Sequence, residues 1–473
     1  MPAENLAPHG LGATQAPGGP DPDADPVVEA NAMLGGGGRG LWYALHPSAW
    51  RSVLASSRYR REALTSSAMS IAAFSIGLVT GPVLARTLGP QGRGEIAAVV
   101  QPAWLLGWLL CFGLPLAAAY WLDDVPEGDL LATTASFGLA VGGVICLALW
   151  FVAPVYLAGH SAATLLWARL FLVILPLSAG VNTALEIRRR RGADLAWNVW
   201  RLGPPVGSAV GIVALALGGM LTVGSALACY FVGGLIPLVF FIRRFWHCRT
   251  YRPSLSAMRQ LLPYAWRSAA QTGASSVTGR LDQVVLATVV PSAQLGLYAV
   301  AVTTASITNM LTIGLPLALF GHQRAEPQGA RSAERYRRSL LTTVAVSSGV
   351  ALALALLAPL LLRLAFGRSF EAAQTSLRIL LPGSVAFDVL GLMTSKLSAD
   401  GRVGEVTRAA FLGAALTIVG LVVVVPRFGI EGASAVTSVT FASQVAYLAL
   451  RERRHGAASP RPDVALGAPP HHP

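Results

Sequence analysis

Long apolar stretches without a charged residue recur along most of the chain. Residues 62–86 and 95–123 contain no Asp, Glu, Lys or Arg between their end residues, and the runs 129–169, 201–243 and 282–324 are equally free of charge. A membrane-spanning helix needs about 20 mostly apolar residues, so each of the last three runs is long enough for two spans. The pattern predicts an all-α integral membrane protein with about twelve transmembrane helices.

The predicted spans fall into two sets of six. They lie at 66–85, 96–122, 131–153, 163–185, 195–217, 220–242, 264–289, 295–320, 339–361, 374–396, 405–426 and 431–450. This spacing predicts a six-helix lobe over 61–242, a cytoplasmic linker at 243–262 and a second six-helix lobe over 263–452. The tails 1–60 and 453–473 are expected to be disordered and cytoplasmic, the first with a candidate interfacial helix. The loops leave no room for a soluble catalytic domain, so function is expected between the helices.

Composition excludes several other classes of protein. Hydrophobic residues make up 53% of the 473 residues and charged residues 12%, about half the share usual in soluble proteins. Four cysteines are too few for a disulfide framework and lack metal-ligand spacing. A soluble enzyme, an extended disordered chain and a disulfide scaffold are therefore excluded, and no metal or cofactor is expected.

The basic residues indicate an orientation in the membrane. The chain has a net charge of +13, and Lys396 is its single lysine. With both termini placed in the cytoplasm, 24 Lys and Arg residues flank the inner side and 6 the outer side, as the positive-inside rule requires. The acidic loop 123–129 is the exception on the inner side. We attribute the positive charge to contact with anionic membrane lipids, so no nucleic-acid partner is expected.

Two segments six predicted helices apart resemble each other. Residues 82–100 and 285–302 each contain a helix end, a proline-containing turn, a glycine and the start of an apolar helix rich in small residues. Because each half would contain an even number of helices, the halves would share one topology about an axis along the membrane normal. The repeat predicts that the two six-helix lobes are pseudo-symmetric.

Three short motifs resemble those of a known family. They are Ala85-Arg-Thr-Leu-Gly-Pro-Gln-Gly-Arg-Gly94, then Arg280-Leu-Asp-Gln-Val-Val-Leu286 followed by Gly296-Leu-Tyr-Ala-Val-Ala301, and Gly429-Ile-Glu-Gly-Ala-Ser-Ala435. They are similar to the signatures of bacterial polysaccharide flippases, which belong to the multidrug/oligosaccharidyl-lipid/polysaccharide exporter superfamily. Span number and topology extend the resemblance over roughly residues 60–452.

The resemblance implies a function. It implies a two-lobed transporter, not an enzyme, that moves a polyprenyl-pyrophosphate-linked oligosaccharide across the bacterial cytoplasmic membrane by alternating access. The peptidoglycan-precursor exporter is a relative that commonly has fourteen helices, so twelve favour the exopolysaccharide or O-antigen branch. A polysaccharide polymerase and glycosyltransferases are candidate protein partners.

Intramembrane charges are the candidate functional residues, because a charge at mid-bilayer costs on the order of 3 kcal/mol. Arg280 is the first candidate for binding the substrate, because guanidinium binds phosphate oxygens bidentately. Gln271 and Asp282 are further candidates on the same predicted helix. The alternative for Arg280 is a structural ion pair with Asp282 or a neighbour, although positions two apart do not share a helical face. Arg201, with Asn198 beside it, is expected to bind substrate or to act structurally.

Two further polar residues belong to the second lobe. Asp388 is a lone acid in its predicted helix, so it is a candidate for the coupling ion, by binding a proton or sodium. It is equally a candidate for an ion pair with an arginine across the lumen, the interpretation slightly favoured. Asn309 is a candidate sugar contact, with an interhelical hydrogen bond as the alternative.

Two other functions compete with the flippase. A multidrug cation antiporter of the same superfamily would offer acids and aromatic rings to a cation, whereas these spans contain more arginine than acid. A membrane glycosyltransferase or polysaccharide polymerase would need acidic residues beside a large outer loop. The acidic pair Asp123–Asp124 falls on the predicted inner side, and the predicted outer loops are short.

Overall fold

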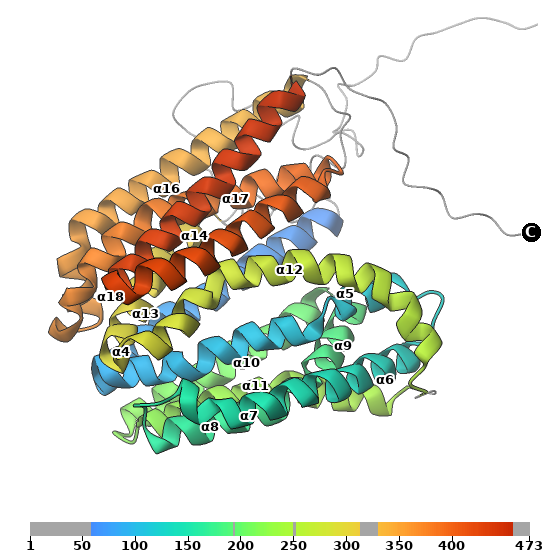
Figure 1. Cartoon of the computed structure of the whole chain (residues 1–473). Coiled ribbons are helices and arrows are strands. Elements are labelled where there is room, and N and C mark those ends of the chain that lie inside the picture. Colours follow the sequence, from blue (N-terminus) through green and yellow to red (C-terminus); the bar gives the residue numbers. More distant parts are fainter. Residues whose placement is uncertain (1–57, 193, 249–251, 313–329, 457–473) are drawn as a thin grey trace, which may run out of the picture. The chain divides into compact units, whose positions relative to one another are not determined.

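The computed structural model describes residues 58–192, 194–248, 252–312 and 330–456, and these residues form helices without a strand. All of them beyond Arg61 belong to one compact unit (Figure 1). The helices of the first half are α4 (Arg58–Cys111), α5 (Leu114–Tyr120), α6 (Glu127–Phe137), α7 (Gly143–Tyr156), α8 (Ala162–Ile174), α9 (Ser178–Arg190), α10 (Asp194–Leu217) and α11 (Val223–Trp246).

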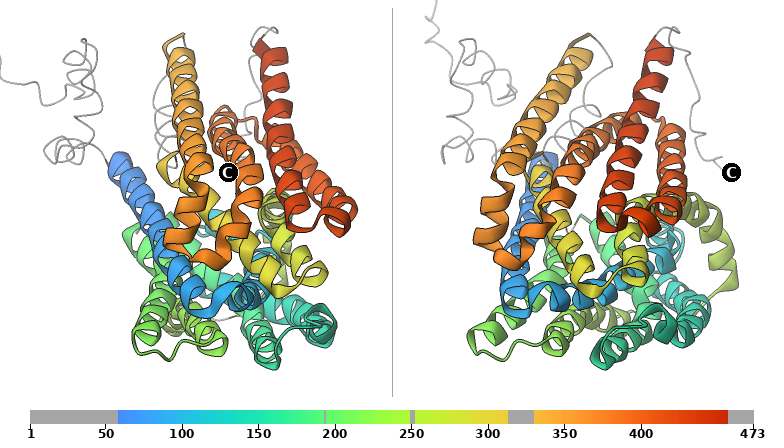
Figure 2. Two further views of the ribbon diagram at one scale, coloured as in Figure 1. Left: turned by 90° about the vertical axis from the view of Figure 1, so that its left-hand side faces the viewer. Right: turned by 60° about the vertical axis from the view of Figure 1, so that its left-hand side comes forward.

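The second half begins with a long helix. Its helices are α12 (Leu255–Val289), α13 (Ser292–Ala305), α14 (Ile307–Thr312), α16 (Ala330–Ala365), α17 (Gln374–Ala399) and α18 (Val403–Gly456). Short π or 3-10 turns join consecutive elements at η1 (Gly138–Gly142), η2 (Leu175–Leu177) and η3 (Arg368–Ala373). Helices α16, α17 and α18 lie side by side (Figure 2), and α10 packs on α11.

Eight segments of the described residues are long and apolar enough to cross a membrane. They are Ala68–Tyr120, Glu127–Tyr156, Ala162–Arg190, Trp197–Leu217, Val223–Trp246, Tyr336–Phe366, Arg368–Ala399 and Val403–Arg454. The expected all-helical membrane architecture is confirmed, although this number is lower than twelve. Helix α12 is absent from the eight because polar residues interrupt it, and the expected span 295–320 ends outside the described residues.

Two of these segments bend at a glycine. Within α4, Gly89 has φ 66° and ψ −176°, and within α18, Gly429 has φ 53° and ψ −132°. A positive φ of this kind is readily adopted only by glycine, because other residues carry a Cβ that collides with the backbone. Each of the two long helices is therefore two helical segments that meet at a turn.

Helix boundaries differ from the expected linker and tail. Helix α11 runs to Trp246 and α12 begins at Leu255, so both enter the expected linker 243–262. Helix α18 continues to Gly456, and its Glu452 carboxylate pairs with Lys396 of α17, which stabilises this end of the helix. Residues 453–456 of the expected tail are thus part of this helix. Residues 1–57 and 457–473 of the expected tails lie outside the described residues.

Two buried apolar clusters join the halves of the chain. One combines Ala85 and Ala97 with Leu295 and Tyr298. The other combines Leu114, Leu130 and Leu185 with Leu261 and Ala265 of α12. Helix α12 also packs on α18, so it contacts both halves.

The two resembling segments contact each other reciprocally. A Cβ placed on Gly94 would lie 1.7 Å from the Ser292 carbonyl oxygen, and one placed on Gly296 would lie 1.9 Å from the Pro90 carbonyl oxygen. Pro90 and Ser292 each precede the repeat glycine by four residues. A reciprocal contact, in which i touches j′ and i′ touches j, is the kind that also occurs at two-fold interfaces. We call this pair of approaches the glycine contact.

Candidate functional site

Arg280 lies where α12 faces α4. Its guanidinium Nη1 donates a hydrogen bond to the Gln101 side-chain oxygen, and its Cζ is 5.4 Å from the centre of the Trp104 ring. Both partners are uncharged and both come from the segment of α4 that follows Gly89. The structure thus places a half-buried guanidinium between the two halves of the chain, and the contacts found for it among the described residues are with neutral groups.

The other two candidates on α12 point elsewhere. Gln271 precedes Arg280 by nine residues, which at 3.6 residues per turn places them on opposite sides of the helix. The Asp282 carboxylate is buried and accepts hydrogen bonds from the Tyr298 hydroxyl at 2.5 Å and from the Gln283 backbone N–H at 2.7 Å. Asp282 therefore lies beside the apolar cluster that contains Tyr298, and its hydrogen bonds go to partners other than Arg280, although the charges of the two residues still act on each other.

Arg201 and Asn198 occupy α10. The Arg201 guanidinium stacks on Trp197, with its Cζ 4.8 Å from the ring centre, and its Nη2 lies 3.4 Å from the Ser70 hydroxyl of α4. Asn198 is buried. Arg201 is thus held by groups different from those that hold Arg280.

Asn309 and Asp388 come together, although a separate role was expected for each from the sequence. The Asn309 amide of α14 donates to the Asp388 carboxylate of α17 at 3.1 Å, and the Ser347 hydroxyl of α16 donates to its other oxygen. Among the described residues, the ion pairs involve other carboxylates, so the favoured pairing of Asp388 with an arginine is not found there. The carboxylate is buried in a setting of neutral hydrogen-bond donors.

Sequence reasoning did not find two of the polar groupings. Ser347 carries no charge and sits in an apolar helix, so spacing gave no sign that it meets Asp388. Glu95, Ser161 and Thr164 form a second grouping, in which the Glu95 carboxylate accepts from both hydroxyls at 2.5 and 2.7 Å. Glu95 stood at the boundary of a charge-free run, which marked the residue but not its partners. No three His, Cys, Asp or Glu side chains gather as a metal site within the described ranges.

The acidic loop 123–129 lies against the arginine-rich loops. Glu127 accepts from Arg244 at 2.5 Å and pairs with Arg191 at 2.7 Å, and Asp123 pairs with Arg190 at 2.8 Å. The backbone N–H of Arg252 donates to Asp129 at 2.9 Å. Asp123 and Glu127, which are exceptions to the positive-inside rule, are therefore counter-ions of arginines that were counted in favour of that rule.

The family of the chain follows from comparison with known proteins. The model of a family described as "Polysaccharide biosynthesis protein" matches residues 60–320, more than half of the chain, so the chain belongs to that family. A curated relative is the succinoglycan biosynthesis transport protein ExoT of Rhizobium meliloti (strain 1021), which is 25% identical over 337 residues. The match covers 68% of this chain and 62% of that protein's length.

Solved structures share the fold. The lipid II flippase MurJ in an inward closed conformation superposes with a TM-score of 0.68 at 13% identity, covering 82% of this chain and 87% of that chain. An inward-facing MATE family multidrug transporter of the MOP superfamily gives a TM-score of 0.65 at 14% identity, covering 81% and 96%. At these identities the likeness concerns the fold alone, which is that of multi-pass membrane transporters.

Proposed function

We propose that the protein is a flippase that moves a polyprenyl-pyrophosphate-linked oligosaccharide across the cytoplasmic membrane by alternating access. Membership of the polysaccharide biosynthesis family and the similarity to a succinoglycan transport protein support this function. The observation that carries it is Arg280, a guanidinium with neutral partners between the two halves of the chain. Such a group binds diphosphate oxygens strongly, because charge-assisted hydrogen bonds are about twice as strong as neutral ones.

The proposed architecture is twelve spans in two pseudo-symmetric lobes. The turns at Gly89 and Gly429 divide two long helices into four segments, and α12 and α13–α14 supply two further crossings. The glycine contact supports a two-fold relation between the lobes. Both termini would be cytoplasmic, because the arginine-rich loops and their acidic counter-ions lie together on one side.

Alternating access would require the outer end to open. At the end that the charge rule places outside, the glycine contact is accompanied by Arg86, which donates to the Ala365 carbonyl at 2.9 Å and to that of Leu364. The Tyr156 hydroxyl of α7 also donates to the Val284 carbonyl of α12 at 3.2 Å. These contacts join the halves, so they would have to separate before the headgroup leaves.

Asp388 is the proposed site of the coupling cation. Its carboxylate is buried with Asn309 and Ser347, which are neutral oxygen- and nitrogen-bearing groups from two other helices. Among the described residues it has no cationic partner, and a buried carboxylate in such a setting is costly, so a bound proton or monovalent cation would relieve that cost. Arg201, Asn198, Gln271 and Asp282 are proposed secondary contributors to the lumen or to its support.

A multidrug cation antiporter is the second candidate, because the MATE transporter shares the fold. It would use Asp388, rather than Arg280, to recognise its substrate. An enzymatic role is not proposed: the Asp123–Asp124 loop that a glycosyltransferase or polymerase would need outside lies beside the arginine-rich loops. Such enzymes are proposed only as partners that make and consume the glycan.

Substitution of Arg280 tests the flippase proposal. Proteoliposomes would be loaded with a fluorescent polyprenyl-diphosphate oligosaccharide, and its arrival in the opposite leaflet would be followed with a membrane-impermeant glycosidase. We expect Arg280→Gln to slow translocation about tenfold or more, with Arg280→Lys intermediate, since lysine keeps the charge but not the bidentate geometry.

The matched control is Arg363→Gln, which removes an exposed arginine that pairs with Glu371 at 3.8 Å. Translocation should stay near the wild-type rate, because exposed ion pairs contribute little. Equal rates for Arg280→Gln and wild type would refute the role of Arg280. Transport of a cationic dye in place of the glycan would favour the antiporter.

A further inference from the structure

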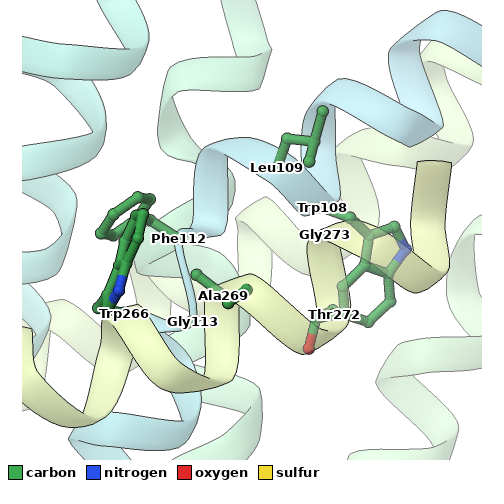
Figure 3. A pocket seen from close by; sticks show the side chains of 9 residues that line it. Trp108, Leu109, Phe112, Gly113, Trp266, Ala269, Thr272 and Gly273 are labelled. Atoms are coloured by element: carbon green, nitrogen blue, oxygen red, sulfur yellow. The ribbon is translucent and has the colours of Figure 1, made fainter. Parts of the chain in front are cut away.

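An aromatic cavity of about 150 Å³ lies where the end of α4 and the start of α5 meet α12 (Figure 3). Figure 3 shows Trp108 on one side of the α12 stretch 269–273 and the Phe112–Trp266 pair on the other. Those two rings are 5.7 Å apart between centroids. The side chains that shape the cavity are those of Trp108, Leu109, Phe112, Trp266 and Thr272, beside Gly273.

The lining suits an apolar chain better than a sugar. Among the lining side chains that the structure describes, Thr272 alone carries a hydroxyl, and none is charged. A sugar ring presents several hydroxyls that would stay unpaired there, at a cost for each. A branched, unsaturated hydrocarbon would instead contact the faces of the aromatic rings.

The cavity and Arg280 share one face of the same pair of helices. On α12, Trp266, Gly273 and Arg280 recur every seven residues, which is close to two helical turns, so they lie in one line. On α4, Trp108 follows Gln101 by seven residues in the same way, and Trp104 lies between them. At 1.5 Å per residue, the cavity is about 10 Å along the helices from the guanidinium.

Resting on the function proposed above, we propose that this cavity holds the first isoprene units of the polyprenyl carrier while Arg280 holds its diphosphate. The sequence of groups along the helices, a cation followed by an apolar aromatic cavity, matches the sequence of groups in a prenyl diphosphate. By the charge rule the cavity lies on the cytoplasmic side of Arg280. A prenyl chain that runs from Arg280 toward the cytoplasmic side has the orientation of a lipid whose headgroup is turned to the outer leaflet, so the cavity would hold the carrier once its headgroup has been inverted.

The cavity would orient the lipid, but it would raise the affinity of the protein for the lipid only a little. Lipid tails are as apolar as the cavity, so burying the prenyl chain brings little hydrophobic gain. What it provides is packing against fixed rings, which a fluid bilayer lacks. The carrier would therefore be held with its diphosphate at a defined depth.

Photo-crosslinking locates the prenyl chain. The full-length protein in phosphatidylethanolamine–phosphatidylglycerol nanodiscs would be irradiated with a farnesyl diphosphate that carries a diazirine on its first isoprene unit. Labelled peptides would be identified by mass spectrometry. We expect labelling of residues 104–113 and 266–273, and about a tenfold decrease in Ala270→Phe, which fills the cavity. The control Ala148→Phe adds the same ring to an exposed position on α7 and should change nothing.

Trp108→Ala is a second variant, which removes an aromatic ring that lines the cavity instead of filling the cavity. It should also lower the labelling of residues 104–113 and 266–273. Labelling confined to other helices, or unchanged in both cavity variants, would overturn the proposal.

The variant Arg280→Gln separates the test of the cavity from the test of the proposed flippase function. If that variant keeps cavity labelling by a photoreactive farnesol but loses labelling by the diphosphate, both assignments stand. If diphosphate labelling also persists, the cavity stands and the role of Arg280 falls.

Discussion

The surroundings of Asp388 leave a carboxylate among uncharged donors. Asn309 and Ser347 each give it one hydrogen bond, and the hydroxyls of Thr308 and Thr312 also lie within its reach. Hydrogen bonds of this kind stabilise a carboxylate but do not cancel its charge. The residue is therefore suited to exchange a proton or small cation as its exposure changes during transport.

Replacing Asp388 by asparagine tests this role. Asp388→Asn keeps the size of the side chain but removes the charge, so the protein should fold and bind glycan lipid while losing its response to a cation gradient. Translocation in proteoliposomes with and without an imposed sodium or proton gradient measures the response. The control Ser347→Ala removes one donor and should weaken the response without abolishing it. A full gradient response in Asp388→Asn would exclude this carboxylate.

How much of the site could be predicted from sequence depends on the residue. Arg280 and Asp388 were identified because a charge within an apolar run is conspicuous in any single sequence. Their partners were not, since the meeting of Arg280 with Gln101 or of Asp388 with Ser347 depends on how helices far apart in sequence pack. The buried Asp282–Tyr298 pair shows the same limit, because periodicity places a residue on a helix but does not say which neighbour it faces.

At the scale of elements, the glycine contact joins two turns through their backbones. Gly94 and Gly296 bring α4 and α13 so close that any side chain would collide with a carbonyl oxygen. The sequence repeat predicted that the two segments are equivalent. That they touch could not be predicted, because an internal repeat gives the similarity of two segments but not the position of the axis between them.

Alanine at these glycines should weaken the contact. We expect Gly94→Ala or Gly296→Ala to destabilise the folded state by about 1–3 kcal/mol, as overpacking does. Thermal unfolding in nanodiscs would show a lower midpoint. Gly349→Ala on α16 is the matched control, since a Cβ there has no atom within 4 Å and alanine is a better helix former by about 0.5–1 kcal/mol. A similar loss in all three variants would argue against a specific contact.

The start of α6 depends on Glu127, whose carboxylate holds two arginines from α11 and the end of α9. Glu127→Gln removes the charge on which both depend. We expect a loss of about 1–2 kcal/mol in stability, below the value for a fully buried pair because the arginines are partly exposed. Glu334→Gln, in an exposed pair with Arg338, should cost less than about 0.5 kcal/mol. Equal unfolding midpoints for the two variants would contradict this assignment.

The number of spans illustrates what sequence patterns leave open at this scale. The charge-free runs in the sequence correctly indicated where the apolar helices lie, because the hydropathy of a segment depends only on the residues within it. Helix α12 contains many polar residues, of which Asp282 and Gln283 are buried inside the molecule, so length and composition alone do not identify it as a span. The turns at Gly89 and Gly429 are similarly hidden within continuous helical segments.

At the scale of the whole molecule, the proposed orientation predicts how Cys248 reacts. Burial raises the pKa of its thiol above the ordinary value, and the charge of Glu127 acts in the same direction. Less thiolate is therefore present at neutral pH, so maleimide labelling should be slow there and should accelerate as pH rises. In a Cys111→Ala, Cys146→Ala, Cys229→Ala background, inside-out vesicles should be labelled and right-side-out vesicles should not.

Two results would contradict that prediction. Labelling of right-side-out vesicles would place the arginine-rich loops outside and reverse the orientation. If the rate of maleimide labelling of Cys248 depended on pH in the same way as that of a small free thiol, the surroundings of Cys248 would not suppress its ionisation. A cysteine placed on an exposed residue near the outer end, Arg363→Cys, is the control for the opposite side.

The glycine contact also bears on how a cell stores energy. The two helical segments approach so closely at Gly94 and Gly296 that a Cβ on either glycine would overlap a carbonyl oxygen, which leaves no space for a file of water at this point. In the proposed flippase, this contact would stand between the lumen and the outside together with the hydrogen bonds of Arg86 and Tyr156. A loosened contact would then let ions leak and dissipate the gradient of the whole membrane, a penalty that reaches every process the gradient drives and not glycan export alone.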